Sequence, residues 1–214
     1  MTQNSRGLSG KLGLITGAAH RVGAQIARTL HATGMDLVLH YRSSVRGAET
    51  IKAELERERP GSVMLLQADL HDARRFPDLM AQVSAFRGRL DLLVNNASSF
   101  YPTPFDTTNE AQWDDLIGSN LKGPFFLAQS AAALLRANRG CIVNLVDIHA
   151  ERPLRDHAVY SIAKAGNAMM VKALARELGP AVRVNGIAPG AILWPEQGLS
   201  EDAKAEILAR TALQ

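Results

Sequence analysis

The stretch LGLITGAAHRVG, residues 12–23, joins three local signals. An apolar run over Leu12–Ile15 predicts a buried strand, the turn TGAAHRVG follows it, and a helical pattern begins at residue 20. A turn of this kind brings backbone N–H groups close to a pyrophosphate, and the helix N-terminus adds the positive end of its dipole. The stretch therefore indicates a dinucleotide site, although Arg21 stands where a third glycine is common.

Strands and helices alternate outward from this stretch along the rest of the chain. The apolar runs that predict buried strands are 12–16, 35–40, 62–68, 91–95, 140–146 and 182–188. Segments of helical period separate them, at 20–33, 45–59, 72–87, 110–136 and 157–178. This alternation predicts an α/β fold: a single-domain, Rossmann-like, doubly wound parallel sheet with helices on both faces. Ligands of such sheets bind beyond the carboxyl ends of the strands, so the residues that follow each strand are the candidates for a site.

The composition of the 214 residues narrows the class of protein. Hydrophobic residues make up 46% and charged residues 21%, which is typical of a globular domain. The net charge of +3 comes from scattered basic residues, so the sequence does not indicate a nucleic-acid partner. No apolar run reaches the roughly 18 residues of a membrane span, and the polar start MTQNSRGLSGK carries no signal core. Because Cys141 is the single cysteine, we expect no intrachain disulfide and a cytoplasmic protein.

The residues after the second and third predicted strands indicate which dinucleotide is bound. After the second strand the chain reads HYRSS, with Arg42 and Ser43 where a carboxylate for the ribose 2′-OH is usual. A guanidinium beside hydroxyls suits a 2′-phosphate, which favours NADPH/NADP+; the alternative is a surface arginine at a helix start. Asp69, after the third strand, either meets the adenine edge or caps a helix.

The segment YSIAK places two chemically active side chains after the fifth predicted strand. Tyr160 and Lys164 are four residues apart in a helical stretch and so share one face. An ammonium stabilises a phenolate, so we expect Lys164 to lower the pKa of Tyr160 and make proton transfer practicable near neutral pH. The same ammonium can hold the nicotinamide ribose.

The segments TGAAHRVG, NNAS, SNLKGPFF, YSIAK and RVNGIAPG occur in this order, and with them the chain resembles the short-chain dehydrogenase/reductase family along nearly all its length. The resemblance implies that Tyr160 donates the proton, that Lys164 supports it and that Asn120 completes a proton relay. Together with the turns described above, it gives the predicted cofactor contacts Gly17, Arg21, Val22, Gly23, Tyr41, Arg42, Ser43, Asp69, Leu70, Asn96, Ala97, Ser98, Tyr160, Lys164, Pro189 and Gly190.

Two departures from the common family pattern refine this interpretation. Asp147 stands thirteen residues before Tyr160, where the family usually has serine, and Arg21 fills the slot of the middle glycine. With NNASSFYPTP and HYRSS, these departures resemble the pteridine reductase branch of the family. That resemblance implies a pterin held by Arg21 and Ser98, and stacked by Phe100 against the nicotinamide. The predicted substrate-binding residues are Arg21, Ser98, Phe100, Asp147, Tyr160 and Trp194.

The predicted reaction is the NADPH-dependent reduction of a dihydropterin, of dihydromonapterin, dihydrobiopterin or dihydrofolate type. Hydride reaches the carbon of a C=N bond, and Tyr160 with Asp147 protonates ring nitrogen. The alternative in the same family is a carbonyl reductase acting on a ketone or a 3-oxoacyl substrate. A third hypothesis is a protein that senses NADPH without turnover.

Several single residues keep a plainer interpretation beside the functional one. Phe100 and Tyr101 can pack a loop, Asp147 can cap a turn, and Trp194 can be a hydrophobic plug. The spacing of the histidines predicts no metal site, and we expect exposed or loop positions for His20, His149 and His157. We expect core positions for Cys141, Met169 and Met170.

The ends of the single domain, 1–214, carry two further expectations. Residues 1–10 read as a polar tail, and residues 191–214 as the substrate-loop region. The family's usual fold continues with another helix and a final strand, so we expect the sequence to be a piece of a longer chain. The resemblance also implies a homotetramer built from the helices at 110–136 and 157–178.

Overall fold

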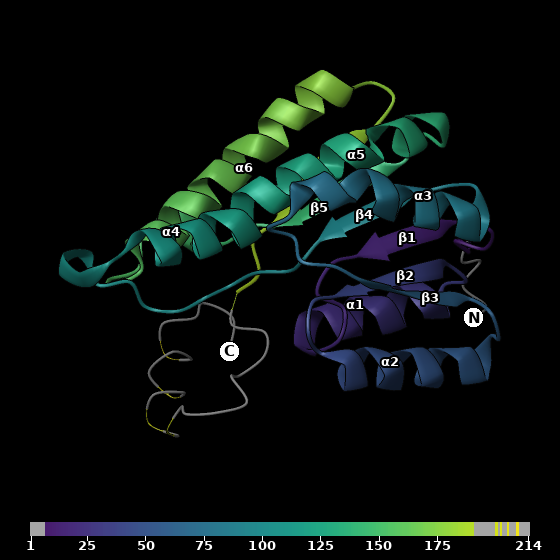
Figure 1. Cartoon of the computed structure of the whole chain (residues 1–214), viewed down its shortest axis with the longest axis horizontal. Coiled ribbons are helices and arrows are strands. Elements are labelled where there is room, and N and C mark those ends of the chain that lie inside the picture. The colour runs from purple at the N-terminus through teal and green to yellow at the C-terminus, as the bar shows by residue number, and fades with distance from the viewer. Residues whose placement is uncertain (1–6, 191–199, 201, 203–204, 206–208, 210–214) are drawn as a thin grey trace.

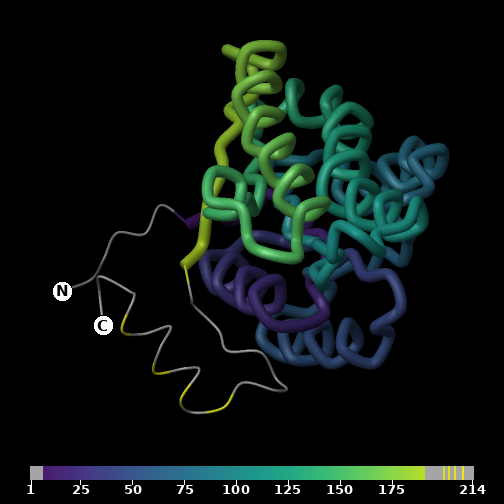
Figure 2. The backbone as a smooth tube through the Cα atoms, turned by 90° about the vertical axis from the view of Figure 1, so that its left-hand side faces the viewer, coloured from purple at the N-terminus to yellow at the C-terminus, as the bar shows by residue number. Residues whose placement is uncertain are grey.

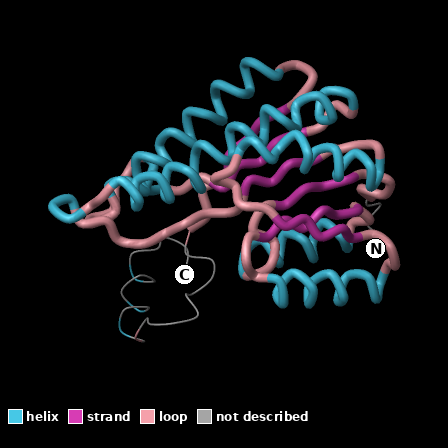
Figure 3. The backbone as a smooth tube through the Cα atoms, viewed as in Figure 1, coloured by secondary structure: helices cyan, strands magenta, loops and turns pink. Residues whose placement is uncertain are grey.

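The computed structural model describes residues 7–190 and the single residues Ser200, Asp202, Ala205 and Ala209. Six parallel strands form one sheet in the order β3-β2-β1-β4-β5-β6 (Figures 1 and 3). The strands are β1 (Leu12–Ile15), β2 (Asp36–Tyr41), β3 (Val63–Gln67), β4 (Leu92–Asn95), β5 (Cys141–Leu145) and β6 (Arg183–Ile187). Each lies within or beside one of the apolar runs of the sequence, so the predicted fold class is confirmed.

Helices cover both faces of the sheet, as a doubly wound fold requires. The helices α1 and α2 lie on one face and α3 to α6 on the other, and the view in Figure 2 keeps the same separation (Figures 1 and 2). Their bounds are α1 (Arg21–Ala32), α2 (Val45–Glu58), α3 (Phe76–Arg87), α4 (Glu110–Ile117), α5 (Gly123–Ala137) and α6 (Ala158–Leu178).

Two apolar clusters, one on each face, hold these layers together. Successive residues of a strand point to opposite faces, and β1 follows this rule: Leu14 belongs to one cluster and Ile15 to the other. The larger cluster adds Phe76 from α3 and Leu127 from α5, both at most 2% exposed. Each such side chain contributes roughly 1.5–3 kcal/mol on burial, so the two clusters dominate the stability of the sheet.

The strand order places a binding crevice between β1 and β4. The chain goes from β1 to β2 and β3 on one side, then crosses back to β4 on the other, so the strand order reverses there. Thr16 joins the two strand ends, because its Oγ accepts hydrogen bonds from the N–H groups of Asn96 (2.9 Å) and Ala97 (3.0 Å). The first strand and the loop after the fourth are thus fixed to each other at the edge where a ligand is expected.

The helix predicted over 110–136 is interrupted. Helix α4 begins with a capping box between Asn109 and Gln112, and a π-helical segment, Gly118–Lys122, follows it before α5 begins. Pro124 lies in the first turn of α5 and has no N–H to donate to the carbonyl of Asn120, four residues before it. The sequence pattern missed this change of register because apolar periodicity barely distinguishes α from π winding.

Three smaller expectations meet the structure with different results. Met170 is 5% exposed, as expected, whereas the adjacent Met169 is 60% exposed, so the predicted core position of Met169 is wrong. Cys141 is half-buried against the smaller cluster. Trp194 and most of the predicted substrate-loop region 191–214 lie outside the described residues. Within the described part of the chain no helix is long and apolar enough to cross a bilayer.

Candidate active site

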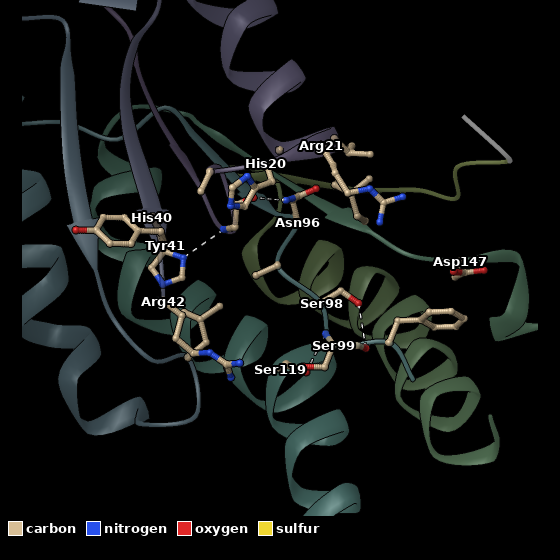
Figure 4. Close-up of a pocket in the computed structure, with 18 of the residues that line it drawn as sticks. His20, Arg21, His40, Tyr41, Arg42, Asn96, Ser98, Ser99, Ser119 and Asp147 are labelled. Atoms are coloured by element: carbon tan, nitrogen blue, oxygen red, sulfur yellow. Dashed lines mark hydrogen bonds between the residues drawn. The ribbon is translucent and has the colours of Figure 1, made fainter. Parts of the chain in front are cut away.

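A cavity of about 620 Å³ lies at the carboxyl edge of the sheet, lined by residues that follow the strands (Figure 4). All sixteen predicted cofactor contacts line it, and so do the predicted substrate residues Phe100 and Asp147. Asn120 is not among its lining residues, and Trp194 lies outside the described chain. In Figure 4, Arg21 and Asp147 lie toward one end of the cavity, and Tyr41 and Arg42 toward the other.

The turn after β1 brings two backbone segments, at Gly17 and Gly23, into close contact. Gly17 has φ +63°, which favours glycine, and a Cβ at Gly23 would collide with the carbonyl oxygen of Gly17. The Asn96 carboxamide holds the turn by donating to the backbone oxygens of Thr16 (2.8 Å) and Gly17 (3.1 Å). No described side chain caps the start of α1, and its first turn contains no acidic residue. The turn and the helix start therefore offer backbone N–H groups to an anion.

Arg21 occupies the first position of α1 in an unusual conformation. Its φ is +48°, in the left-handed region that side chains rarely adopt. Holding a non-glycine residue there costs on the order of 1–3 kcal/mol, and such strain gathers at functional sites. Arg21 is accommodated at the position of the middle glycine because its backbone adopts a glycine-like conformation. Its side chain then lines the cavity.

The start of α2 forms a second place suited to an anion. Arg42, Ser43 and Ser44 line the cavity just before it, with no cap bond from the Ser44 side chain and no acidic residue in the first turn. The Arg42 side chain is 56% exposed, and its Nη1 lies 3.9 Å from the Asp115 carboxylate. The His20 ring also lines the cavity and packs where a Cβ of Gly47 would otherwise stand.

The buried His40 ring connects the turn after β1 to the end of β3 through its two nitrogens. The N–H of Gly17 donates to Nδ1 (3.3 Å), and Nε2 faces the carbonyl of Ala68 (3.1 Å), so the neutral ring carries its proton on Nε2. Burial lowers the pKa of His40 to about 4. The sequence analysis missed this residue, because one polar side chain in an apolar strand carries no sign of its partners.

Asp69 after β3 does not cap a helix. Its Oδ1 accepts from the backbone N–H of His71 (3.0 Å) and lies 2.6 Å from Nδ1 of the same residue. The other ring nitrogen of His71 lies 3.1 Å from the carbonyl of Asp115. The next helical turn begins after Asp72, so the interpretation of Asp69 as a helix N-cap is wrong. Both Asp69 and His71 line the cavity, and a contact of Asp69 with the adenine edge stays a prediction.

Tyr160 and Asp147 form the central contact at the other end of the cavity. The phenol O–H donates to Oδ2 of Asp147 at 2.6 Å, while Oδ1 accepts from the N–H of His149 at 3.0 Å. The two readings of Asp147, as a cap and as a partner of Tyr160, therefore hold at once. Burial, with the hydrogen bond to Asp147 and the negative charge of Asp147, raises the pKa of Tyr160 well above its usual range. The net shift of the Tyr160 pKa is therefore upward, opposite to the lowering expected from Lys164.

Lys164 lies beneath the phenol rather than against its oxygen. Its Nζ donates to the carbonyl of Leu145 (2.8 Å) and is 5.6 Å from the ring centroid of Tyr160. Burial lowers the pKa of Lys164 to about 8, although the charge of Asp147 acts in the opposite direction. Desolvation is the largest cause of the pKa shift of both Tyr160 and Lys164, and helical spacing alone could not reveal it.

Phe100 and Tyr101 take different positions. The Phe100 ring is 56% exposed, lines the cavity, stacks on His157 at 4.8 Å and meets Tyr160 edge-on at the same distance. Tyr101 packs against a small apolar cluster, and its O–H donates to Asp115 Oδ2 (3.0 Å). The loop-packing interpretation therefore describes Tyr101, whereas Phe100 presents an aromatic face.

Asn120 reaches the site through the loop after β4. Its Oδ1 accepts from the Ser98 hydroxyl at 2.6 Å, and its Nδ2 donates to the carbonyls of Ser99 (2.9 Å) and Leu116 (3.0 Å). The residue is 1% exposed. Sequence reasoning also missed several cavity-lining residues, although each lies near other predicted site residues: His20, His71, Ser119 and His149.

A parallel sheet of this order, helix starts open to anions at its carboxyl edge and a buried Tyr160–Lys164 pair define a nucleotide-binding oxidoreductase. The chain belongs to the short-chain dehydrogenase family, whose pattern matches residues 11–203. Members of this family use nicotinamide cofactors.

Three relatives illustrate the range of enzymes that the chain resembles. It is 35% identical to pteridine reductase 1 of Leishmania tarentolae, over 91% of this chain and 82% of that protein. It is 33% identical to the 3-oxoacyl-[acyl-carrier-protein] reductase FabG of Staphylococcus aureus, over 95% and 83%. It is 36% identical to 3beta-hydroxysteroid dehydrogenase 1 of Eggerthella lenta, over 88% and 73%. Because these identities are so close, similarity alone does not choose the substrate.

Proposed function

We propose that the protein reduces a dihydropterin, of dihydromonapterin, dihydrobiopterin or dihydrofolate type, to its tetrahydro form with NADPH. The observation that carries the proposal is the 2.6 Å hydrogen bond between Tyr160 and Asp147, beside the exposed ring of Phe100. A carboxylate and a phenol sharing a proton suit the protonation of ring nitrogen, and an exposed aromatic face suits a flat heterocycle.

The residues present fit NADPH as the cofactor. Because Gly17 and Gly23 have no side chains, a pyrophosphate can approach the open start of α1, and Arg42 with Ser43 offers donors for a 2′-phosphate at the start of α2. Lys164 is positioned to hold a ribose hydroxyl. When bound, NADPH supplies the hydride.

Three residues are assigned to substrate binding. Phe100 stacks on the pterin, and His157 supports the ring from the other side at 4.8 Å. Arg21 donates hydrogen bonds to the polar edge of the pterin; its planar guanidinium can also stack, which lysine cannot do. Ser98 contributes a hydroxyl that is already oriented by Asn120.

Tyr160 delivers the proton. Its raised pKa keeps the phenol protonated at neutral pH, and a substrate nitrogen at this place competes with Asp147 for the phenol proton. The ammonium of Lys164, 5.6 Å from the ring centroid, stabilises the phenolate that remains. Asn120 is assigned to the relay that returns a proton from solvent. In balance, the dihydropterin gains one hydride and one proton, and NADPH leaves as NADP+.

A carbonyl reductase is the second candidate. The similarity to FabG and to a hydroxysteroid dehydrogenase supports it, because these names describe keto and hydroxyl chemistry at nearly the same identity. Tyr160, Lys164 and Asn120 would serve a ketone equally well. Asp147 distinguishes the candidates, since a carboxylate repels the developing oxyanion of a ketone that a serine hydroxyl would stabilise.

The proposal includes assembly as a homotetramer through the long helices. Large apolar side chains are exposed on all three helices. Trp113 on α4 is 44% exposed and Phe125 on α5 is 39% exposed, while on α6 Ile162 is 51% and Met169 is 60% exposed. Burying this surface against a second copy would remove it from water. Sedimentation equilibrium tests the assembly, and Met169→Glu is expected to lower the oligomeric mass.

The decisive experiment measures NADPH oxidation with a panel of dihydropterins, ketones and 3-oxoacyl thioesters. We expect turnover with a dihydropterin, and a loss of about 10²-fold in kcat for Asp147→Ala because a proton-transfer partner is removed. Asp147→Ser is the matched variant: it restores the common family residue and is expected to improve ketone turnover while pterin turnover stays low. Turnover of ketones alone by the unaltered protein, or pterin turnover that survives Asp147→Ala, contradicts the proposal.

A further inference from the structure

Four buried asparagines from different elements form a chain of hydrogen bonds behind the site. Asn95 Nδ2 in β4 donates to Asn144 Oδ1 in β5 (2.9 Å), and Asn144 Nδ2 donates to Asn167 Oδ1 in α6 (3.0 Å). Asn167 Nδ2 then donates to the backbone carbonyl of Asn120 in the π-helical segment (2.8 Å). All four residues are at most 4% exposed.

The last bond of this chain meets a specific need. In an α-helix the carbonyl of Asn120 would accept from the N–H of residue 124, but that residue is Pro124. A buried carbonyl without a partner costs roughly 1–3 kcal/mol. Asn167, 47 residues later in the chain, supplies a donor where the α-helical register has none.

The position of Asn167 is otherwise suited to an apolar residue. Its buried neighbours on α6 include Ala163 and Met170, so the helix buries this face in the core. A carboxamide there must be desolvated, and this is tolerated only because both of its ends are bonded. The residue type therefore follows from its two partners rather than from packing.

We propose that Asn167 is a positioning residue: it anchors the carbonyl of Asn120 to the central sheet and so fixes the π-helical segment in the register that directs the Asn120 side chain to Ser98 and Ser99. The role acts through Asn120 and rests on the proposed relay function of that residue. It does not depend on whether the substrate is a pterin or a ketone.

The anchor also relates the relay to the cofactor end. Asn95 is followed directly by Asn96, whose carboxamide holds the turn after β1 at Thr16 and Gly17. The hydrogen-bonded chain from Asn120 through Asn167 and Asn144 therefore ends at Asn95, directly before the residue whose side chain holds the turn after β1. The Asn120 segment and the turn after β1 are therefore both held in place by residues at the ends of β4 and β5.

The test compares Asn167→Leu with Met170→Ala. Both substitutions disturb the buried face of α6, but only the first removes the donor to Asn120. We expect Asn167→Leu to raise the amide hydrogen exchange of residues 118–122 about tenfold, and to lower kcat about tenfold, with the Kd for NADPH and KM within about twofold. Met170→Ala is expected to lower the melting temperature while leaving both readouts nearly unchanged.

A rescue variant separates the hydrogen bond from packing. Pro124→Ala restores a backbone N–H that can donate to the carbonyl of Asn120 when this segment takes the α-helical register. Pro124→Ala combined with Asn167→Leu is therefore expected to recover the exchange protection of residues 118–122, but not kcat, because the register that directs the Asn120 side chain is changed. Equal exchange at 118–122 in Asn167→Leu and Met170→Ala, or no recovery in the double variant, overturns the anchor. Protection lost as predicted with kcat unchanged overturns the positioning role. If no substrate of either class is turned over, the proposed function fails, while the exchange experiment still decides the anchor.

Discussion

Two regions of the cavity, the starts of α1 and α2 and the groups around Tyr160, satisfy their polar groups in opposite ways. At the starts of α1 and α2 no described side chain caps the helix, and the Arg42 side chain is 56% exposed, with the Asp115 carboxylate 3.9 Å away. At the Tyr160 end the phenol, Asp147 and Lys164 are already bonded to protein groups at 2.6 to 3.0 Å. The helix starts, called the open end below, present donors to a ligand, whereas the groups around Tyr160, called the organised end, are held by hydrogen bonds within the protein.

The largest expected effect comes from breaking the organised end. Tyr160→Phe removes the proton donor but keeps the ring, so we expect kcat to fall by roughly 10²–10⁴-fold with the Kd for NADPH nearly unchanged. Steady-state kinetics and a fluorescence titration of the cofactor measure the two quantities.

Tyr101→Phe is the matched control for this substitution. Tyr101 also donates its O–H to a carboxylate, Asp115, at 3.0 Å, but it is not among the residues that line the cavity. A comparable loss of kcat in both variants would mean that the contact between Tyr160 and Asp147 has no special role.

A second effect tests whether Lys164, in the organised end, is desolvated in the folded protein. The pKa of Lys164 is lowered from 10.5 to about 8, so between these values the unfolded chain holds a proton that the folded chain has lost. Stability therefore rises with pH across this window. Relative to Lys164→Met, we expect the free energy of unfolding to increase by about 3 kcal/mol from below pH 8 to above pH 10.5. Urea denaturation of the cofactor-free proteins across this range measures the difference, and a flat difference would show that Lys164 is solvated.

The third prediction concerns the open end. Arg42→Ala is expected to weaken NADPH binding by about 10- to 100-fold, since a charge-assisted hydrogen bond contributes roughly 1.5–3 kcal/mol, and to leave NADH binding nearly unchanged. Calorimetry with both dinucleotides measures this selectivity. Arg46→Ala removes the same charge one turn later, at an exposed position outside the cavity lining, and should affect both dinucleotides little. Equal losses for NADPH and NADH in Arg42→Ala would exclude a 2′-phosphate contact.

The smallest effect concerns His40, which lies near the open end but has a hydrogen-bond partner for each ring nitrogen. Its pKa is lowered from 6.5 to about 4, so the unfolded chain binds a proton that the folded chain refuses as the pH falls below 6.5. Its contribution to stability is present above pH 6.5 and is lost towards pH 4, by about 2 kcal/mol at pH 5. His40→Gln is expected to lack this part of the acid dependence in urea denaturation at pH 7 and pH 5. An unchanged acid dependence would mean that the ring is protonated in the fold.

The sequence was a good guide to the strands and to the residues that follow them. Each apolar run became a strand, and every predicted cofactor residue lines one cavity, because strand ends and glycine turns are local features. The exposed Met169 and the π-helical segment before α5 were missed. The sequence also could not give the direction in which the pKa of Tyr160 shifts, since that depends on burial and on Asp147, thirteen residues away.

By itself, the sequence determined the parallel α/β sheet, the glycine-bearing turn and the presence of Tyr160, Lys164 and Asp147 near one edge. Only the tertiary structure decided how these groups act: that Asp147 divides its two oxygens between His149 and Tyr160, and that Asn167 replaces the donor missing at Pro124. The physical reason is range. Periodicity and turn chemistry act over a few residues, whereas desolvation and hydrogen-bond partnership depend on residues that only folding brings together.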